Sequence, residues 1–364
     1  MRIASIESFP VVLPLTTPVK MSHVTIDVSH NVLVKVTTDD GIVGWGEGVP
    51  AMDVTGENQG RILASIEDLG SRIVGRDPLG HGDLWAELRR TVYGNTTGIG
   101  ALDIALHDIA GKVRGVPVAE LIGGPRRSTV PALTLVGSGD PAADLEAFEE
   151  RYRAGYRWFK LKLGIGDLGE EARTLVAMAA AHDDAVVCGD TNGGWTEEES
   201  ARFLVAVEGS PVRFVEQPTM STDALIRLAE GSSVAICADE SARSLDDVAA
   251  LGKTAVAGVS LKLIKHAGIT GVMRGAAVCD RFGLQINLAG KIAESAISAA
   301  ANIHAAAAMS DTGFGCSPAN QTLVADVCTD PPKVVDGAYT VPTGPGLGVE
   351  VDARILWLQA SVCR

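Results

Sequence analysis

Two lysines stand close together in an otherwise apolar stretch of the chain, Phe159–Gly164. Side chains alternate along a β-strand, so Lys160 and Lys162 are expected to share one face, with the apolar residues around them on the other. A lysine inside a sheet or barrel is costly unless the chemistry there needs it, and burial readily shifts its pKa. The alternative is an edge strand whose lysines face water. Residues further along the chain favour the first interpretation.

Three later apolar stretches each end on a carboxylate, at Asp190, Glu216 and Asp239. If each stretch is a parallel strand, the three carboxylates meet at one rim of the sheet or barrel and repel one another unless a cation joins them. Oxygen-only ligation with open positions suits Mg²⁺, and we expect Mn²⁺ to substitute for it. The alternative is that each carboxylate caps the helix that follows it. Three such residues in register with a two-lysine strand favour the metal site.

A further lysine, Lys262, lies in the apolar stretch Val259–Leu263. In a barrel, this sixth strand lies opposite the second, so Lys262 and Lys162 are expected to face each other across the metal. A proton α to a carboxylate is hard to remove because the enolate that it leaves is unstable in water. A divalent cation offsets that charge, and a neighbouring cation favours the neutral, basic form of a lysine.

The polar residues that end these stretches follow one another at intervals of 23 to 28 residues, from Lys162 to Lys262. A strand, a helix and two loops need about that length, so repeated βα units and a parallel sheet are expected. We predict an α/β fold, a modified TIM barrel over residues 126–325 with its catalytic groups at the C-terminal ends of the strands. An open doubly wound sheet is the alternative, but no G-x-G-x-x-G follows an early strand.

The segments on either side of the predicted barrel have different sequence patterns. Residues 1–125 begin with alternating, strand-like sequence and an Asp39-Asp40-Gly41 hairpin turn, and continue with helical periodicity. They predict an N-terminal α+β capping domain. Within it, the polar, proline-containing segment Thr16–His23 is a candidate mobile loop that closes over the barrel mouth. Residues 326–364 are turn-rich and are expected to return to the capping domain.

Acidic residues outnumber basic ones by 45 to 31, which gives a formal net charge of −14. This charge argues against nucleic acid or an anionic membrane surface as a partner, whereas a small anionic substrate stays compatible because a metal inverts the local field. The six cysteines include no C-x-x-C pair, and the N-terminus has no apolar run of signal-peptide length. The apolar stretch Ile297–Met309 is too short to span a membrane. We therefore expect a cytoplasmic protein with reduced cysteines, and we expect a homo-oligomer.

In these motifs the chain resembles the muconate lactonizing enzyme subgroup of the enolase superfamily, which also contains the mandelate racemase family. The resemblance spans essentially the whole chain and rests on seven motifs: Gly44-Trp45-Gly46-Glu47, Lys160-Leu161-Lys162, Asp190-Thr191-Asn192, Glu216-Gln217-Pro218, Asp239-Glu240, Leu261-Lys262-Leu263 and Pro345-Gly346-Leu347-Gly348-Val349-Glu350.

The resemblance implies a capping domain over a (β/α)₇β barrel. It also implies that Asp190, Glu216 and Asp239 bind Mg²⁺ and that Lys162 and Lys262 form the acid/base pair. A lysine base acting with Mg²⁺ is an established arrangement of that superfamily, not a result of this spacing. Lys160 would then bind the carboxylate of a small substrate or tune Lys162.

The last barrel strand departs from the pattern of the subgroup. Its cycloisomerases carry a glutamate there and its dipeptide epimerases an Asp-x-Asp pattern, whereas this chain has Thr312–Ser317. After the seventh strand, Lys291 and Glu294 lie near the rim, either as substrate contacts or as an ion pair at a helix start. We count Lys160, Asn192 and Glu294 as candidate substrate-binding residues.

Several activities fit these residues. Two opposed lysines favour a racemase or epimerase, then a cycloisomerase, then a dehydratase of a hydroxy acid, all through the same enolate. A metal-free Schiff-base lyase is another class, which the three carboxylates disfavour. A non-catalytic binding barrel is the third, which the intact lysines and carboxylates disfavour.

Overall fold

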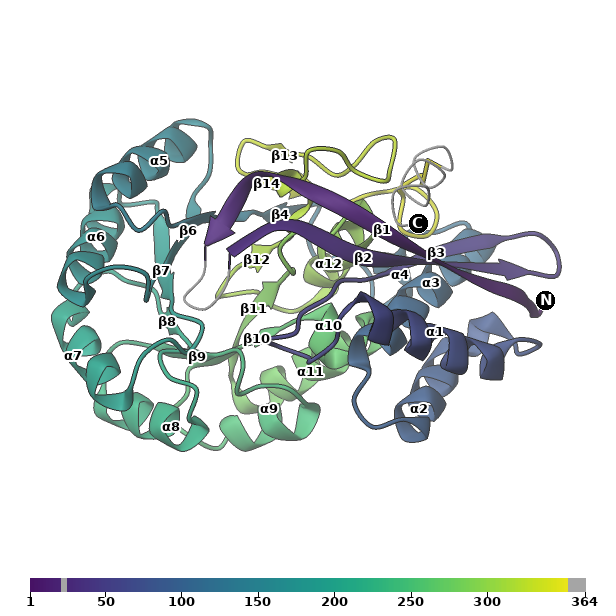
Figure 1. Cartoon of the computed structure of the whole chain (residues 1–364), viewed down its shortest axis with the longest axis horizontal. Coiled ribbons are helices and arrows are strands. Elements are labelled where there is room, and N and C mark those ends of the chain that lie inside the picture. Colours follow the sequence, from purple (N-terminus) through teal and green to yellow (C-terminus); the bar gives the residue numbers. More distant parts are fainter. Residues whose placement is uncertain (21–24, 353–364) are drawn as a thin grey trace.

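The computed structural model describes residues 1–20 and 25–352, and it divides into a cap and a barrel. Figure 1 shows the antiparallel sheet of the cap extending to one side of the barrel, with the strands and outer helices of the barrel on the other side. The barrel comes from the middle of the chain, and the C-terminal segment contacts both parts.

The cap consists of a three-stranded antiparallel sheet, in the order β1-β2-β3, packed against helices. The predicted hairpin turn at Asp39–Gly41 is confirmed, because it joins β2 to β3 and Gly41 has a φ of 86°. The elements of the cap are β1 (Ile3–Lys20), β2 (Thr25–Thr38), β3 (Val43–Gly48), α1 (Gln59–Ile73), η1 (Pro78–Gly80), α2 (His81–Thr91), α3 (Thr96–Arg114) and α4 (Val118–Leu121).

The Gly-Trp-Gly-Glu motif lies on β3, where the sheet packs directly on the long helix α3. A Cβ atom on Gly44 or Gly46 would overlap the carbonyl oxygens of Ala105 and Ala101 in that helix. Only glycine therefore permits this close approach. The packing fixes β3, and Glu47 at its end, relative to the rest of the cap.

The segment Thr16–His23, predicted to be a loop, is largely strand. Thr16–Lys20 belong to β1, and Val19 and Lys20 pair with Ile26 and Thr25 of β2 after an irregularity that begins at Pro14. The prediction was wrong for these five residues because their threonines and valine suit an extended ladder despite Pro18. The rest of the predicted loop, 21–23, lies outside the described residues.

Eight parallel strands form the barrel, in sequence order from β5 to β12. An isolated parallel bridge between Ala132 and Cys316 joins the first strand to the last. Seven βα units and a final strand are present, which confirms the predicted (β/α)₇β architecture. The strands are β5 (Leu133–Val136), β6 (Trp158–Lys162), β7 (Val186–Asp190), β8 (Val215–Glu216), β9 (Ile236–Ala238), β10 (Gly258–Leu261), β11 (Gln285–Ala289) and β12 (Cys316–Ser317).

Helices connect successive strands on the outside of the barrel (Figure 1). The predicted alanine-rich helix is α12, and its residues are buried throughout. The helices are α5 (Pro141–Arg153), α6 (Leu168–Ala181), α7 (Glu197–Val207), α8 (Thr222–Gly231), α9 (Leu245–Leu251), α10 (Leu263–His266), α11 (Ile269–Phe282) and α12 (Ala296–Ala308).

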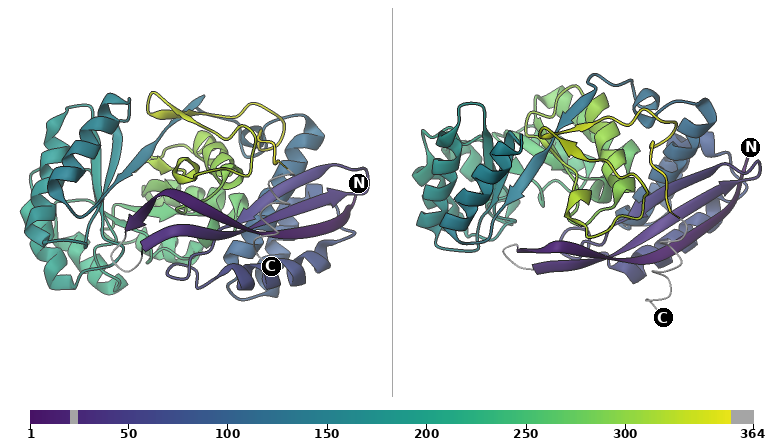
Figure 2. Two further views of the ribbon diagram at one scale, coloured as in Figure 1. Left: turned by 45° about the horizontal axis from the view of Figure 1, so that its top comes forward. Right: turned by 90° about the horizontal axis from the view of Figure 1, so that it is seen from above.

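The C-terminal segment contacts both parts of the molecule. After η2 (Asn320–Thr322), strands β13 (Val334–Val335) and β14 (Ala338–Thr340) form a small sheet with β4 (Thr129–Pro131), which precedes the barrel. Further on, the Leu347 N–H donates to Asp108 Oδ1 of α3, at 2.9 Å. Figure 2 shows this segment, in yellow, beside the barrel and the purple sheet of the cap.

Of the helices in the described part of the chain, none is long and apolar enough to cross a membrane. The five cysteines within those residues, Cys188, Cys237, Cys279, Cys316 and Cys328, are buried free thiols.

Candidate active site

Three predicted carboxylates lie at the C-terminal ends of neighbouring barrel strands. Asp190 is the last residue of β7, and it stands opposite Glu216, the last residue of β8, in the parallel ladder. Asp239 directly follows β9. All three are buried, with 3% or less of each residue exposed. The barrel therefore brings together the three carboxylates that the sequence predicts.

The two lysines of β6 point to the same side of their strand and reach two of these carboxylates. Lys160 Nζ forms an ion pair with Glu216 Oε2. Lys162 Nζ lies 2.7 Å from Asp190 Oδ2 and 2.8 Å from Asn192 Oδ1. The predicted common face of Lys160 and Lys162 thus points into the barrel.

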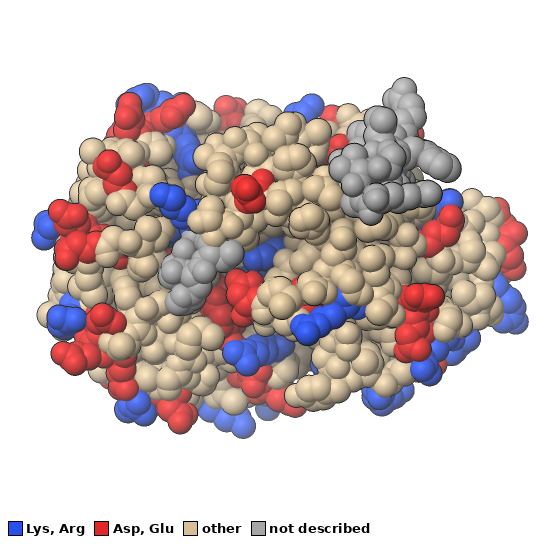
Figure 3. Space-filling view, in the orientation of Figure 1, with Lys and Arg blue, Asp and Glu red and all other residues tan. Residues whose placement is uncertain are grey.

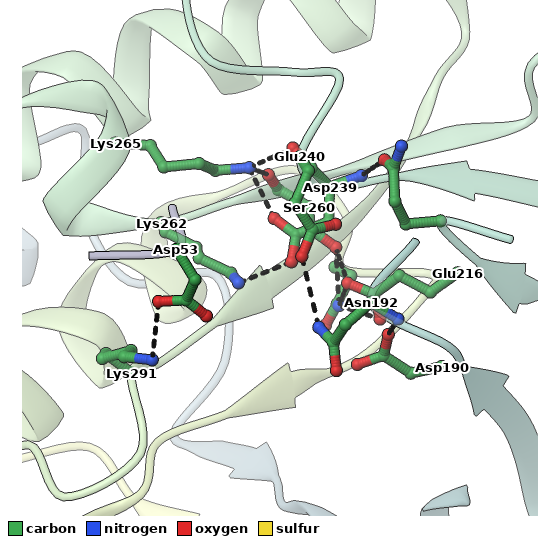
Figure 4. A network of polar contacts seen from close by, with 12 residues as sticks. Asp53, Asp190, Asn192, Glu216, Asp239, Glu240, Ser260, Lys262, Lys265 and Lys291 are labelled. Atoms are coloured by element: carbon green, nitrogen blue, oxygen red, sulfur yellow. Dashed lines mark hydrogen bonds and ion pairs between the residues drawn. The ribbon is translucent and has the colours of Figure 1, made fainter. Parts of the chain in front are cut away.

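Lys262 approaches from the other wall of the barrel. It follows β10, and the four steps β6-β7-β8-β9-β10 place it diametrically opposite Lys162 in a closed eight-stranded barrel. Its Nζ lies 2.5 Å from Asp239 Oδ2. The strands that lead to Asp190, Glu216 and Asp239 lie between those of the two lysines in the strand order. Figure 4 shows the three carboxylates close to Lys262.

Asn192, predicted to bind substrate, belongs to this cluster. Besides its contact with Lys162, its Nδ2 donates to Glu240 Oε1 at 3.2 Å, and its backbone N–H donates to Asp190 Oδ1 at 3.0 Å. Its φ of 48° lies in the left-handed region, which asparagine tolerates better than most residues. This conformation turns the chain back at the end of β7, so that the amide faces both Lys162 and Glu240.

Glu294 has a different environment. Its carboxylate accepts from the backbone N–H groups of Lys291 and Ala319, at 3.2 and 3.0 Å, and from Asn302 Nδ2 at 3.2 Å. The alternative of a Lys291–Glu294 ion pair was wrong, because Lys291 meets Glu294 through its backbone, while its Nζ pairs with Asp53. Glu294 lines one small cavity with Lys262 and Lys291, and its contact with substrate stays a prediction.

Three polar residues of the site were not assigned from the sequence. Lys265 Nζ lies 2.6 Å from Asp239 Oδ1 and, at 2.8 Å, donates to the Ser260 carbonyl. Ser260 Oγ donates to Glu216 Oε1 at 2.5 Å, and Asn287 Nδ2 donates to Ser260 Oγ at 2.8 Å. Ser260 stands two residues before Lys262, so strand alternation could have placed both inside. Lys265 is brought back to the rim by the short helix α10. This helix was not predicted because it directly continues the apolar stretch Val259–Leu263.

The charges of the cluster depend on one another. Burial alone would raise the pKa of Asp239, but Lys262 and Lys265 hold it well below the ordinary aspartate range. Lys162 and Lys160 likewise overcome burial and lower the pKa of Asp190. Conversely, burial tends to lower the pKa of Lys262, but Asp239 and Glu240 raise it above its usual value. Asp190 and Asp239 are thus kept ionised by lysines rather than by water, whereas burial raises the pKa of Glu216 despite the opposing effect of Lys160.

The donor set fits a hard divalent cation. Within residues 1–20 and 25–352, no group of three or more His, Cys, Asp or Glu side chains is arranged to hold a metal, because each carboxylate engages a lysine. The ligand chemistry nevertheless agrees with such an ion, since Asp190, Glu216 and Asp239 offer oxygen donors from adjacent strands. In addition, the neighbouring Glu240 Oε2 is buried without a hydrogen-bond partner. Figure 3 shows acidic and basic side chains gathered in a hollow of the face viewed in Figure 1.

Comparison with known proteins agrees with this architecture. Residues 4–123 match the family "Mandelate racemase / muconate lactonizing enzyme, N-terminal domain", and residues 143–355 match "Enolase C-terminal domain-like". Over 361 residues, the chain is 32% identical to a chloromuconate cycloisomerase of Delftia acidovorans, covering 97% of each chain.

Two solved structures have the same fold. The muconate lactonizing enzyme of Pseudomonas fluorescens, complexed with muconolactone, superposes with a TM-score of 0.93 at 28% identity, over 98% of this chain and 99% of that one. An N-succinyl Arg/Lys racemase of Bacillus cereus gives 0.92 at 25% identity, over 99% and 98%. The chain therefore belongs to the muconate lactonizing enzyme subgroup of the enolase superfamily and is an isomerase.

Proposed function

We propose that this isomerase removes the proton α to a carboxylate of a small substrate and returns it, so that the substrate is racemised or epimerised. The observation that carries the proposal is the pair of buried lysines, Lys162 and Lys262, on opposite walls of the barrel with three carboxylates between them. One lysine takes the proton from one face of the α-carbon, and the other delivers a proton to the opposite face.

Asp190, Glu216 and Asp239 would hold the divalent cation, with Mg²⁺ as the expected ion and Mn²⁺ as a substitute. Enzymes of this family are metal-dependent, which supports this assignment. When bound, the cation supplies positive charge where the enolate develops. Lys160 contributes a further fixed positive charge, because it is buried beside Glu216 and the surrounding groups raise its pKa.

The end of the last barrel strand favours proton transfer between two faces over other reactions. β12 ends with Cys316–Ser317 and is followed by Pro318, so no acidic side chain projects from this position. In the subgroup, cycloisomerases carry a glutamate there. Lys162 and Lys262 are then the acid/base groups on the two faces of the substrate, which is what a racemase or epimerase needs.

Cycloisomerisation of an unsaturated diacid is the second candidate, and the 32% identity with a chloromuconate cycloisomerase favours it. In this reaction one carboxylate of the substrate adds to the conjugated double bond, which closes the lactone ring and leaves an enolate, and one lysine then protonates the α-carbon. The two candidates therefore share a site and differ in the substrate.

The experiment that tests the proposal is incubation in D₂O with Mg²⁺ and a library of amino-acid derivatives, hydroxy acids, sugar acids and muconates. Uptake of deuterium at an α-carbon, with interconversion of the two configurations, is the expected result. Lactone formation without interconversion would replace racemisation by cycloisomerisation. Trapping of a keto acid by borohydride at either lysine would instead establish a Schiff-base enzyme and overturn the proposal.

A further inference from the structure

A further lysine, Lys291, lies at the barrel mouth, and the acid/base chemistry does not use it. Lys291 follows β11, and its side chain is only 9% exposed. It lines one small cavity together with Lys262. Its only ion pair within the described residues is with Asp53, at 3.8 Å, which is too long for a hydrogen bond.

The other lysines of the site are paired far more closely. Lys162, Lys262 and Lys265 each have a carboxylate oxygen within 2.7 Å of Nζ. Because a buried charge without a close partner costs several kcal/mol, Lys291 is the one lysine of this cluster whose charge the folded protein leaves poorly compensated. Burial lowers its pKa, Asp53 raises it, and Lys262 and Lys162 lower it again, so all three groups are close enough to act on it.

The backbone that carries Lys291 is held by interactions that do not involve its ammonium group. The backbone N–H of Lys291 donates to Glu294 Oε2 at 3.2 Å, and Asn31 Nδ2 donates to the Ala293 carbonyl at 2.8 Å. Two residues on, the Ser295 N–H donates to Glu47 Oε1 at 3.0 Å. The loop is thus fixed between cap and barrel while the Lys291 side chain stays available.

The partner of Lys291, Asp53, comes from the cap and is partly exposed to solvent. Asp53 lies in the turn that follows β3, where the backbone N–H groups of Val54, Thr55 and Gly56 donate to the Ala51 carbonyl. The Asp53 side chain is 46% exposed, so water competes for it. Figure 4 shows Asp53 directed toward Lys291, beside Lys262. An anionic group of a ligand could therefore take the place that Asp53 now occupies.

We propose that Lys291 binds a second anionic group of the substrate, so that the enzyme selects dianionic carboxylates over monoanionic ones. The inference rests on the proposed function for the first carboxylate, which lies among the cations at the centre of the barrel. A second carboxylate, at the far end of the substrate from the reacting carbon, then pairs with Lys291 and displaces Asp53. This pairing satisfies a buried charge that is poorly compensated in the free enzyme, which is how a polar site discriminates against a ligand that lacks the group.

The test compares matched probes by calorimetry in the presence of Mg²⁺: adipate against hexanoate, and cis,cis-muconate against its monomethyl ester. The wild-type enzyme is expected to bind each dianion more tightly than its monoanionic partner. Lys291→Met should weaken binding of the dianions by about 10- to 100-fold, the range for a hydrogen bond to a charged group, and leave the monoanions unchanged. Asp53→Asn should increase the affinity for the dianions several-fold, because it removes the competing carboxylate.

Two variants separate this role from a structural one. Lys291→Arg keeps the charge and should retain most of the preference, whereas Lys291→Met should fold with an unchanged or higher Tm, because it removes a weakly paired buried charge. Equal weakening of dianion and monoanion, or no weakening of either, would overturn the inference. So would an absence of preference in the wild type. If the preference stands but no α-deuterium exchange occurs with any substrate, the proposed function fails while the anion site survives.

Discussion

The molecule contains two sets of buried carboxylates, and they are held in opposite ways. At the barrel mouth, Asp190, Glu216 and Asp239 each contact a lysine. Between cap and barrel, Glu47 and Glu294 accept from amide and backbone N–H groups, and Glu47 also interacts with the side chains of Ser298 and Ser295. Both sets are almost completely buried, so burial alone does not distinguish them.

For four of these five carboxylates the pKa follows the partners. Lysines lower the pKa of Asp190 and Asp239, whereas burial, followed by the nearby Glu47, raises the pKa of Glu294 to about 8. Burial also raises the pKa of Glu47. Glu216 is the exception in the first set, because burial raises its pKa despite the ion pair with Lys160. Asp190 and Asp239 are thus held anionic and suited to a cation, and the second set is suited to holding backbone N–H groups. The role of a buried acid is therefore inferred from its hydrogen-bond and ion-pair partners rather than from how completely it is buried.

The largest expected effect comes from making the same substitution once in each set. Glu216→Gln should lower activity by about 10³-fold or more, because under the proposed function it removes a ligand of the cation, which would contribute several kcal/mol to catalysis. Glu294→Gln is the matched control. Mg²⁺ should raise the Tm of the wild type and of Glu294→Gln, and raise that of Glu216→Gln much less. An equal response of both variants to Mg²⁺ would remove the distinction between the two sets.

The next effect separates the two lysines proposed as the acid/base pair, Lys162 and Lys262. Lys162→Ala and Lys262→Ala should each lose about 10²- to 10⁴-fold in racemisation, the usual contribution of a positioned acid or base. Deuterium exchange should disappear for one enantiomer in the first variant and for the other in the second. Lys333→Ala is the control, because that lysine is exposed and only its surface pair with Asp330 is lost. If both variants exchange both enantiomers at the wild-type rate, neither lysine is the base.

The sequence allowed the barrel mouth to be predicted because strand ends fix side chains directly. Asp190 and Glu216 are the last residues of their strands, and Asp239 is the first residue after its strand. The order of parallel strands then determines which side chains meet, and no tertiary detail is needed. The family and the (β/α)₇β fold were predicted from the resemblance, which rests on these residues together with the Gly44–Glu47 and Pro345–Glu350 motifs.

Prediction was less accurate where position depends on contacts between distant segments. Glu294 follows β11 by five residues, and its direction is set by Ala319 and Asn302, which no local pattern connects to it. Similarly, β1 extends to Lys20 because β2 pairs with it, although Pro18 indicated a loop. Lys265 reaches Asp239 from α10, a helix of a single turn that ends at Ala267, whose φ is 61°.

A substitution in the second set, the carboxylates between cap and barrel, should affect stability rather than chemistry. Glu47→Ala leaves the N–H groups of Ser295 and Ser298 without this acceptor, while the Asn31 amide keeps the Ala293 carbonyl. Each unsatisfied buried group costs about 1–3 kcal/mol, so the two N–H groups together predict a loss of about 2–6 kcal/mol in the free energy of unfolding. Urea denaturation measures this loss, and Mg²⁺ affinity measured by titration should change little. A large loss of Mg²⁺ affinity without a loss of stability would contradict the assignment.

The smallest effect is a dependence of stability on pH that belongs to Glu294. With its pKa raised to about 8 by burial and by Glu47, the folded protein keeps a proton that the unfolded chain releases above an ordinary value of 4.5. The unfolded state then binds fewer protons, so the free energy of unfolding falls as pH rises between these two values, by at most about 1.4 kcal/mol per pH unit. Below 4.5 and above 8 the group contributes no slope.

Glu294→Gln should remove this slope, since an amide does not titrate. The neutral acid has a natural acceptor in Asn302, whose Oδ1 is buried without a hydrogen-bond partner and becomes accessible to the acid proton if the amide turns over.

Buried histidines such as His304, whose pKa is lowered to about 4 by burial, act in the opposite sense, because they make the fold more stable as pH rises toward 6.5. They titrate alike in both proteins, so the difference in unfolding free energy between wild type and variant isolates Glu294. From pH 6 to 7.5 that difference should shift against the wild type by about 1–2 kcal/mol. Parallel pH profiles would mean that Glu294 is ionised in the folded state, and the two sets of buried carboxylates would then not differ in charge.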